Sequence, residues 1–186
     1  MLKYKYIFLL TLVMAVSYSV AQDVYFTRSG HIYFISHTDI IDIDANNHQA
    51  AGFLDVTTGK VQCAVLIKSF EFTLATAKEH FNESYMDSDK FPKAEFKGEI
   101  VNINSINLAE QGSYLATVKG KLTIKGQTKD LETQVEMIVK ESEILASCSF
   151  DVTISDFNIK VPALVENRVA KVVQVSLGFK YQPYKK

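Results

Sequence analysis

Residues 114–125 read Tyr-Leu-Ala-Thr-Val-Lys-Gly-Lys-Leu-Thr-Ile-Lys. Apolar side chains recur at alternate positions, from Tyr114 through Val118 to Ile124, and lysine or threonine occupies most positions between them. Because successive side chains of a strand point to opposite faces, this alternation predicts a strand with one buried and one solvated face. The stretch therefore indicates a sheet with an apolar interior on one side.

The same alternation recurs along the rest of the chain. Three earlier segments are also strand-like, although apolar side chains occur on both of their faces. Together the segments predict about eight strands. The further alternating segments are residues 94–102, 131–139, 144–154 and 173–181, and the earlier ones are 32–37, 51–56 and 61–68.

The connections between strands predict their direction. Thr57-Thr58-Gly59 and Lys125-Gly126 are short and rich in turn formers, so hairpins are favoured over helical crossovers and the sheet is expected to be antiparallel. A closed barrel and a sandwich both satisfy this pattern. Periodicity alone leaves that choice open.

Two segments depart from the strand pattern. In residues 74–86, Leu74, Ala77, Phe81 and Tyr85 follow steps of three and four, which predicts a short amphipathic helix with candidate caps at Thr73 and Thr76. Residues 162–170 begin with a proline and predict a short helical segment between two strands. The expected fold class is all-β with these two helical interruptions.

Composition excludes several classes of protein. The 186 residues are 47% apolar and 22% charged, as in an ordinary single globular domain. Twenty basic and twenty-one acidic side chains give a formal net charge of −1. No excess of positive charge is available to neutralise phosphates, so nucleic acid is not an expected partner.

The first 21 residues resemble a targeting segment. Lys3 and Lys5 precede the apolar run 7–16, and Ser19-Val20-Ala21 forms a small-residue cleavage pattern. The run is shorter than the roughly 20 apolar residues of a spanning helix, so we expect a signal peptide cleaved after Ala21 and not an integral membrane protein. The remaining domain, residues 22–186, has 165 residues and a formal net charge of −3 because the signal carries two lysines and no acid. A periplasmic or secreted protein is expected.

Sequence motifs for catalysis and metal binding are absent. The chain lacks a nucleophile elbow, a zinc-protease helix, a phosphate loop and a dinucleotide fingerprint, so neither an enzyme nor a cofactor is expected. His31 and His37 would share a strand face but lie roughly 20 Å apart at ~3.3 Å per residue, too far for one metal ion. Cys63 and Cys148 are candidates either for a disulfide or for two buried thiols.

Three segments, together with an early strand that contains Phe34, resemble one protein family. Residues 80–98 run from a short helix through a Phe91-Pro92 turn into a strand, as in the YceI-like polyisoprenoid-binding family. Residues 118–129 are similar to that family's Gly-x-Leu-Thr-Ile-His-Gly-Val-Thr-Lys signature, and residues 150–162 to its late segment. The resemblance extends in order across the whole chain that follows the signal.

The chain departs from the family signature at two positions. Lys125 stands where the family usually has His, and Gln127 stands where it usually has Val. A polar contact that the family histidine made to a ligand headgroup would therefore not be expected here.

The resemblance implies an exported, lipocalin-like, eight-stranded antiparallel barrel without catalytic residues, whose lumen holds a long isoprenoid such as a quinone or polyprenol. It thus implies the barrel rather than the sandwich. Phe81 and Tyr85 are the candidate lid. Each predicted lining side chain would equally serve as core in a filled barrel. The predicted lining residues are Phe34, Phe96, Val118, Leu122, Ile124, Val135, Met137, Phe150, Val152, Val175 and Phe179.

Energetics favour a long ligand. One isoprene unit contributes roughly 3 kcal/mol if it counts as about four buried CH₂ groups. Association costs about 4–15 kcal/mol, so several units are needed to offset it.

The alternative function is a packed scaffold for stress response or envelope assembly, which would contact a protein partner through Lys119, Lys121 and Lys125. The identity of the lipid and the formation of a homodimer stay open.

Overall fold

The computed structural model describes residues 24–108 and 110–184, most of which lie in strands. The predicted signal peptide, residues 1–21, and its cleavage site lie outside the described residues. A two-residue strand, β4 (Glu71–Phe72), pairs only with the edge of β2. The long strands are β1 (Val24–His37), β2 (Asp42–Asp55), β3 (Lys60–Leu66), β5 (Lys93–Ile100), β6 (Gly112–Ile124), β7 (Gln127–Val139), β8 (Ile144–Thr153) and β9 (Val172–Pro183).

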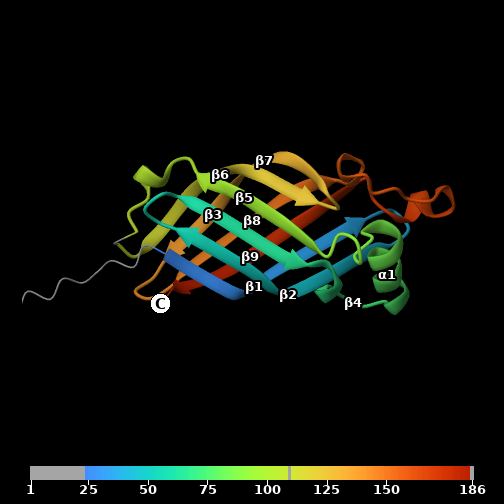
Figure 1. The fold of residues 1–186 in the computed structure, drawn as a ribbon, viewed down its shortest axis with the longest axis horizontal. Helices are drawn as coiled ribbons and strands as arrows, with labels where there is room; N and C mark the ends of the chain where they lie inside the picture. Colours follow the sequence, from blue (N-terminus) through green and yellow to red (C-terminus); the bar gives the residue numbers. More distant parts are fainter. Residues whose placement is uncertain (1–23, 109, 185–186) are drawn as a thin grey trace, which may run out of the picture.

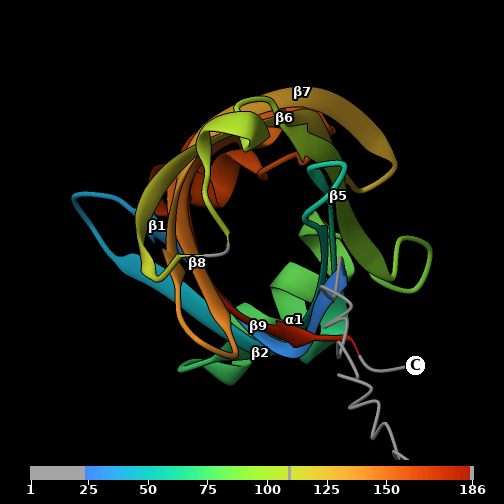
Figure 2. The ribbon, with the colours of Figure 1, turned by 90° about the vertical axis from the view of Figure 1, so that its left-hand side faces the viewer.

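These eight long strands close into a barrel. Each strand pairs antiparallel with its neighbour in the chain, and β1 pairs with both β2 and β9. The ring is visible end-on in Figure 2. The structure therefore confirms the eight-stranded antiparallel barrel and excludes the sandwich that periodicity had left open.

The turn between β6 and β7 shows why the predicted hairpin forms. Ile124 pairs with Gln127, and the two residues between them, Lys125 and Gly126, have φ angles of 48° and 74°. Two central residues with positive φ define the tight turn whose twist matches that of paired strands. The Lys125-Gly126 connection is thus a two-residue hairpin, as predicted.

Strands β1 and β2 are longer than the sequence pattern indicated. The prediction began β1 at residue 32 and β2 at residue 51, whereas the strands begin at Val24 and Asp42. Two register shifts interrupt the pairing of β1 with β2 between Thr27 and Ile32, so strict alternation is lost there. In the first half of β2, several polar side chains occur on both faces of the strand, so the sequence does not show a regular alternation of apolar and polar residues there.

Both predicted helical segments form, and both lie at the same end of the barrel (Figure 1). Helix α1 (Ala75–His80) continues into a π-helical turn, η2 (Phe81–Tyr85), and a 3₁₀ segment, η5 (Ala163–Arg168), follows Pro162. The predicted threonine caps were wrong. The residue at the start of α1 is Leu74, and no side chain caps it.

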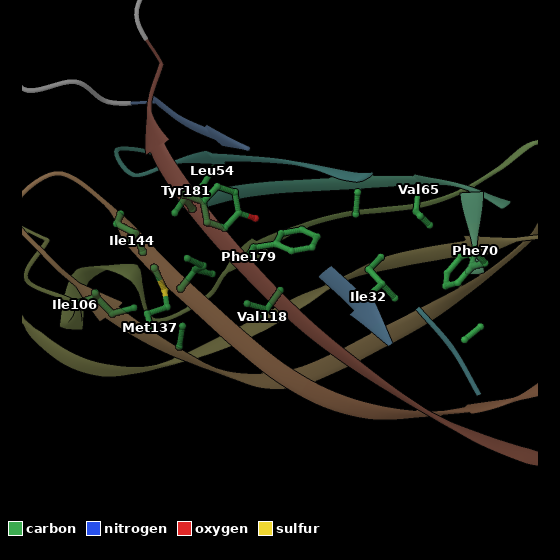
Figure 3. Close-up of a cluster of buried hydrophobic side chains, with 14 residues drawn as sticks. Ile32, Leu54, Val65, Phe70, Ile106, Val118, Met137, Ile144, Phe179 and Tyr181 are labelled. Carbon is green, nitrogen blue, oxygen red and sulfur yellow. The ribbon is translucent and has the colours of Figure 1, made fainter. Parts of the chain in front are cut away.

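The opposite end of the barrel is filled by side chains. Met137, Ile144 and Tyr181 are 1–3% exposed, and Ile106 closes over them from the loop after η3 (Ile103–Ser105). Figure 3 shows these residues gathered at one end of the buried cluster. This packed end anchors the barrel and leaves no space between its side chains for a large ligand.

A pair of glycines allows β5 and β6 to approach closely. Gly98 lies directly opposite Gly120, and a Cβ on Gly120 would lie 2.4 Å from the Lys97 carbonyl oxygen and 2.7 Å from the Phe96 ring. The obstacle is partly backbone, so a side-chain rotation cannot relieve it. The absence of a Cβ here lets the Phe96 ring lie over the strand pair.

We expect Gly120→Ala to reduce the free energy of unfolding by about 1–3 kcal/mol, because its methyl group would overlap the neighbouring backbone. The matched control is Gly178→Ala in β9, where an added Cβ has nothing within 4 Å. That variant should be neutral or slightly more stable, since alanine restricts the unfolded chain. Urea denaturation measures both, and equal effects of the two substitutions would contradict the close-approach account.

Candidate functional site

The burial of inward-facing side chains changes along the barrel. On β6, Ala116 and Val118 are buried, whereas Leu122 and Ile124, nearer the end that carries α1, are only half-buried. On β7, Met137 is buried and Val135 is half-buried. Side chains that point inward but keep exposed surface face empty space. The lumen is therefore filled at one end and hollow toward α1.

A cavity occupies the hollow part of the lumen. Its volume is about 320 Å³, within the range of about 300–1,000 Å³ typical of small-molecule sites. Residues from all eight long strands, from α1 and η2, and from the loop before β9 form its wall. On β6 the wall from Val118 to Ile124 extends roughly 20 Å at ~3.4 Å per residue. The cavity is deep enough for an extended chain.

The structure brings all the predicted lumen residues and both candidate lid residues to the wall of this cavity. Whether they contact a ligand is a separate question that stays a prediction. The lumen residues at the wall are Phe34, Phe96, Val118, Leu122, Ile124, Val135, Met137, Phe150, Val152, Val175 and Phe179, and the lid residues are Phe81 and Tyr85.

The deeper wall is apolar. The inward positions of β5 are Ala94, Phe96 and Ile100. Glu95 borders the cavity near the end that carries α1, and it accepts a hydrogen bond from Lys93 Nζ at 2.8 Å. This hydrogen bond lowers the pKa of Glu95, so the carboxylate stays ionised and paired with Lys93. Among the inward residues of β7, Thr133 is the polar one. The lumen is thus suited to a hydrocarbon, and the one carboxylate at its border, Glu95, is already paired with Lys93.

Four phenylalanines close one side of the hollow end. The Phe81 ring, at the junction of α1 and η2, lies 5.5 Å from Phe34, 5.6 Å from Phe70 and 5.0 Å from Phe72, between ring centroids. Aromatic rings at these separations attract one another and bury apolar surface. The cluster holds the helical segment against the barrel wall, in the position expected of a lid.

Sequence analysis missed two members of this aromatic cluster. Phe70 lies just before the two-residue strand β4, and Phe72 lies in it. This segment is too short for the alternation to be recognised. The signal was present, because Phe70 and Phe72 flank Glu71 with a spacing of two. Tyr181 and Leu177, both on the inward face of β9, also line the cavity and were predicted only as members of a strand.

Polar side chains lie near the rim. His80 on α1 and Tyr85 on η2 both line the cavity at the end that carries the helices. Burial raises the pKa of the Tyr85 hydroxyl, which therefore stays protonated and able to donate a hydrogen bond. Lys125, which replaces the family histidine, turns its Nζ toward the Asn158 carbonyl oxygen at 3.4 Å and does not line the cavity. An amphiphilic ligand would thus place its polar group near the helices.

The two cysteines are free thiols in the structure, on strands that face the lumen. Burial raises the pKa of Cys63 to about 12 and that of Cys148 to about 11. The Tyr181 hydroxyl hydrogen-bonds the Cys63 thiol, and burial raises the pKa of this tyrosine as well. Both side chains are half-buried at the cavity wall, and their formation of a disulfide stays a prediction to be tested.

Histidines of β1 and β2 lie outside this cavity. His31 stacks on His48 with ring centroids 4.5 Å apart and shares a hydrogen bond with Asn46 Oδ1, while His37 pairs with Asp42 at 2.5 Å. In the part of the chain that the structure describes, no group of three histidine, cysteine or carboxylate side chains converges on one point to hold a metal ion.

Within residues 24–108 and 110–184, no helix is long and apolar enough to traverse a lipid bilayer.

The outer lysines form cross-strand ion pairs. Lys119 lies 3.1 Å from Glu132, and Lys121 lies 2.6 Å from Asp130, each directly opposite its partner on β7. Exposed pairs of this kind contribute about 0.2–1 kcal/mol. Their charges are therefore largely satisfied within the barrel.

Comparisons with known proteins agree with this architecture. The family model of the YceI-like domain matches residues 24–181 of the chain. A comparison with curated proteins gave no match.

Several solved structures share the fold. A polyisoprenoid binding domain from Saccharophagus degradans superimposes with a TM-score of 0.75 at 13% identity, covering 88% of this chain and 99% of that one. BcnA from Burkholderia cenocepacia gives 0.67 at 18% identity, covering 82% and 95%. The YceI protein of Campylobacter jejuni gives 0.61 at 15% identity, covering 81% and 91%. At these identities the likeness is one of fold.

The raised thiol pKa values predict slow modification of the folded protein. Against an ordinary thiol pKa of 9.0, values of about 11 and about 12 lower the thiolate fraction near pH 8 by about a hundredfold for Cys148 and a thousandfold for Cys63. Ellman's reagent should therefore react slowly with the native protein, Cys148 first, and rapidly after unfolding in guanidinium. Two thiols that appear only after reduction would reveal a disulfide and contradict the free-thiol arrangement.

Proposed function

The chain belongs to the YceI-like family, and on this premise we propose that it is an exported, non-catalytic binding protein that holds a long isoprenoid lipid in its lumen. Export rests on the signal-like residues 1–21, and the proposed location is the periplasm or the medium. The observation that carries the proposal is the continuous apolar cavity inside a closed barrel.

The shape of the cavity favours a chain-like ligand over a compact one. Its wall runs along the inward faces of the strands, and its deep part has no charged side chain. Each isoprene unit contributes roughly 3 kcal/mol of burial, so several units in line offset the association cost of about 4–15 kcal/mol. The deep, narrow lumen allows this burial to accumulate along the chain.

The ligand would enter tail first. The tail would lie against the half-buried side chains Leu122, Val135 and Val175, and the polar headgroup would remain near His80 and Tyr85. A quinone ring or a polyprenol hydroxyl fits this rim because both accept hydrogen bonds without carrying a full charge. The lumen therefore favours a neutral headgroup.

The alternative function, a packed scaffold that contacts a protein through its outer lysines, has less support. A scaffold would be expected to fill its lumen, and the outer Lys119 and Lys121 are paired within the barrel. No specific observation favours this alternative over the lipid carrier.

Natively purified protein should contain a long-chain isoprenoid, detected by solvent extraction and mass spectrometry. Leu122→Asp places a charge in the hollow lumen, and Val135→Phe fills space without adding charge. Both should abolish co-purification, because a buried charge or a blocked lumen opposes the hydrocarbon chain. Lys121→Ala, which alters the adjacent outward position, is the matched control and should retain the lipid.

Circular dichroism and thermal melting check that the variants of this test are folded. Equal lipid content in Val135→Phe and Lys121→Ala would contradict binding in the lumen. Loss of a protein partner on Lys121→Ala, with no lipid in any sample, would favour the scaffold instead.

A second prediction concerns the lid. Phe81→Ala removes the ring that joins η2 to the barrel wall, so release of a bound fluorescent polyprenol should accelerate several-fold while its stoichiometry stays unchanged. Phe91→Ala is the control, since Phe91 does not line the cavity. Stopped-flow transfer to acceptor vesicles measures the rate. Unchanged release from Phe81→Ala would mean that this segment is not a lid.

A further inference from the structure

Exposed apolar side chains gather at the end of the barrel that carries α1 and η5. Among the described residues, ten large apolar side chains are strongly exposed, and six of them lie at this end. They occur in the β1–β2 turn, at the end of β3, before α1, in η5 and at the start of β9, which Figure 1 places together on the right. The six are Ile40, Ile41, Leu66, Leu74, Leu164 and Val172.

Five of these six exposed residues lie within three positions of a residue that lines the cavity; Leu164 is the exception. Ile41 precedes the lining residue Ile43 by two positions, Leu74 lies between Phe72 and Ala77, and Val172 precedes Val173. The apolar lining of the lumen therefore continues outward onto the surface of this end. The lining of the lumen and the exposed apolar side chains thus lie on the same segments of the chain.

The loop that carries η5 extends farthest from the barrel. Leu164 is 94% exposed, and its neighbours Pro162 and Ala163 are exposed as well. Figure 1 shows this loop projecting beyond the strands, and its base returns to the cavity through Ile159 and Val169. An aliphatic side chain with so little protein contact is available to an external apolar phase.

The charge of this loop is opposite to that of the chain as a whole. The loop between β8 and β9, residues 154–171, contains Lys160, Arg168 and Lys171 against Asp156 and Glu166, a formal charge of +1 in a chain of net charge −1. Lys171 lies 3.7 Å from Glu166, whereas neither Lys160 nor Arg168 forms an ion pair with another described residue. Two cations thus flank the exposed leucine. This combination matches an anionic phospholipid surface, where apolar side chains enter the interface and cations contact phosphates.

We propose that the end of the barrel carrying α1 and η5 docks on an anionic phospholipid bilayer, with Leu164 inserted, so that lipid passes between bilayer and lumen without crossing water. The proposal rests on the proposed function, because a carrier of insoluble lipid must exchange its ligand with a membrane. A bilayer fits better than a protein partner, since the apolar residues lie on several separate segments and a fluid surface can receive each of them without a matching shape.

Vesicle flotation tests the proposal with the purified protein and vesicles of equal parts phosphatidylethanolamine and phosphatidylglycerol. Leu164→Asp should lower the vesicle-bound fraction about tenfold, because a leucine inserted in the bilayer is replaced by a charge that the anionic surface repels. Leu115→Asp is the matched control. Leu115 is 62% exposed, but it lies on β6 at the opposite end of the barrel, so this variant should bind like the unaltered protein.

The second readout separates docking from lipid binding. Transfer of a fluorescent polyprenol from vesicles should be slower for Leu164→Asp than for Leu115→Asp, while both variants should bind the same amount of polyprenol supplied in detergent. Failure to bind polyprenol in detergent, with vesicle docking intact, would count against the proposed function alone. Equal vesicle binding by the two variants would overturn the docking proposal. So would a Leu164→Asp effect confined to self-association in analytical ultracentrifugation.

Discussion

The pairing of β1 with β9 is the constraint on which the rest of the structure depends. It joins the first and last strands, so an antiparallel meander becomes a closed ring without an unpaired edge. Closure fixes which alternate side chains face inward, and with eight strands the enclosed space is only just wide enough for side chains or one slender ligand. The cavity, its lining and its two different ends all follow from this closure.

The two ends of the barrel use the enclosed space differently. At one end, Met137, Ile144 and Tyr181 fill the lumen and provide the close packing that stabilises a domain of this size. Toward α1 the inward side chains do not meet across the lumen and leave the cavity open. The packed end accounts for the stability of the barrel, and the hollow end can hold a ligand without forming a core of its own.

Strict alternation made most of the barrel predictable. From β5 to β9, residues such as Val118, Val135 and Phe150 repeat with a period of two, and all line the cavity. Prediction failed where local geometry departs from that period, as in the register shifts of β1 near Gly30. It also failed for Phe70, because the strand beside it has only two residues and the contacts of this ring with Phe34 and Phe81 come from other elements. Alternation assigns a face but does not tell whether facing side chains touch, so the hollow lumen required the structure.

The central claim is that a prenyl chain lies along the inward faces of β6, β7 and β9. The most direct measurement is of intermolecular nuclear Overhauser effects between an unlabelled polyprenol and protein labelled at its leucine, isoleucine and valine methyl groups. The account predicts contacts from prenyl protons to Leu122, Val135 and Val175, and none to the outward-facing Leu115 and Ile138. Contacts confined to outward methyl groups, or none at a saturating lipid concentration, would contradict it.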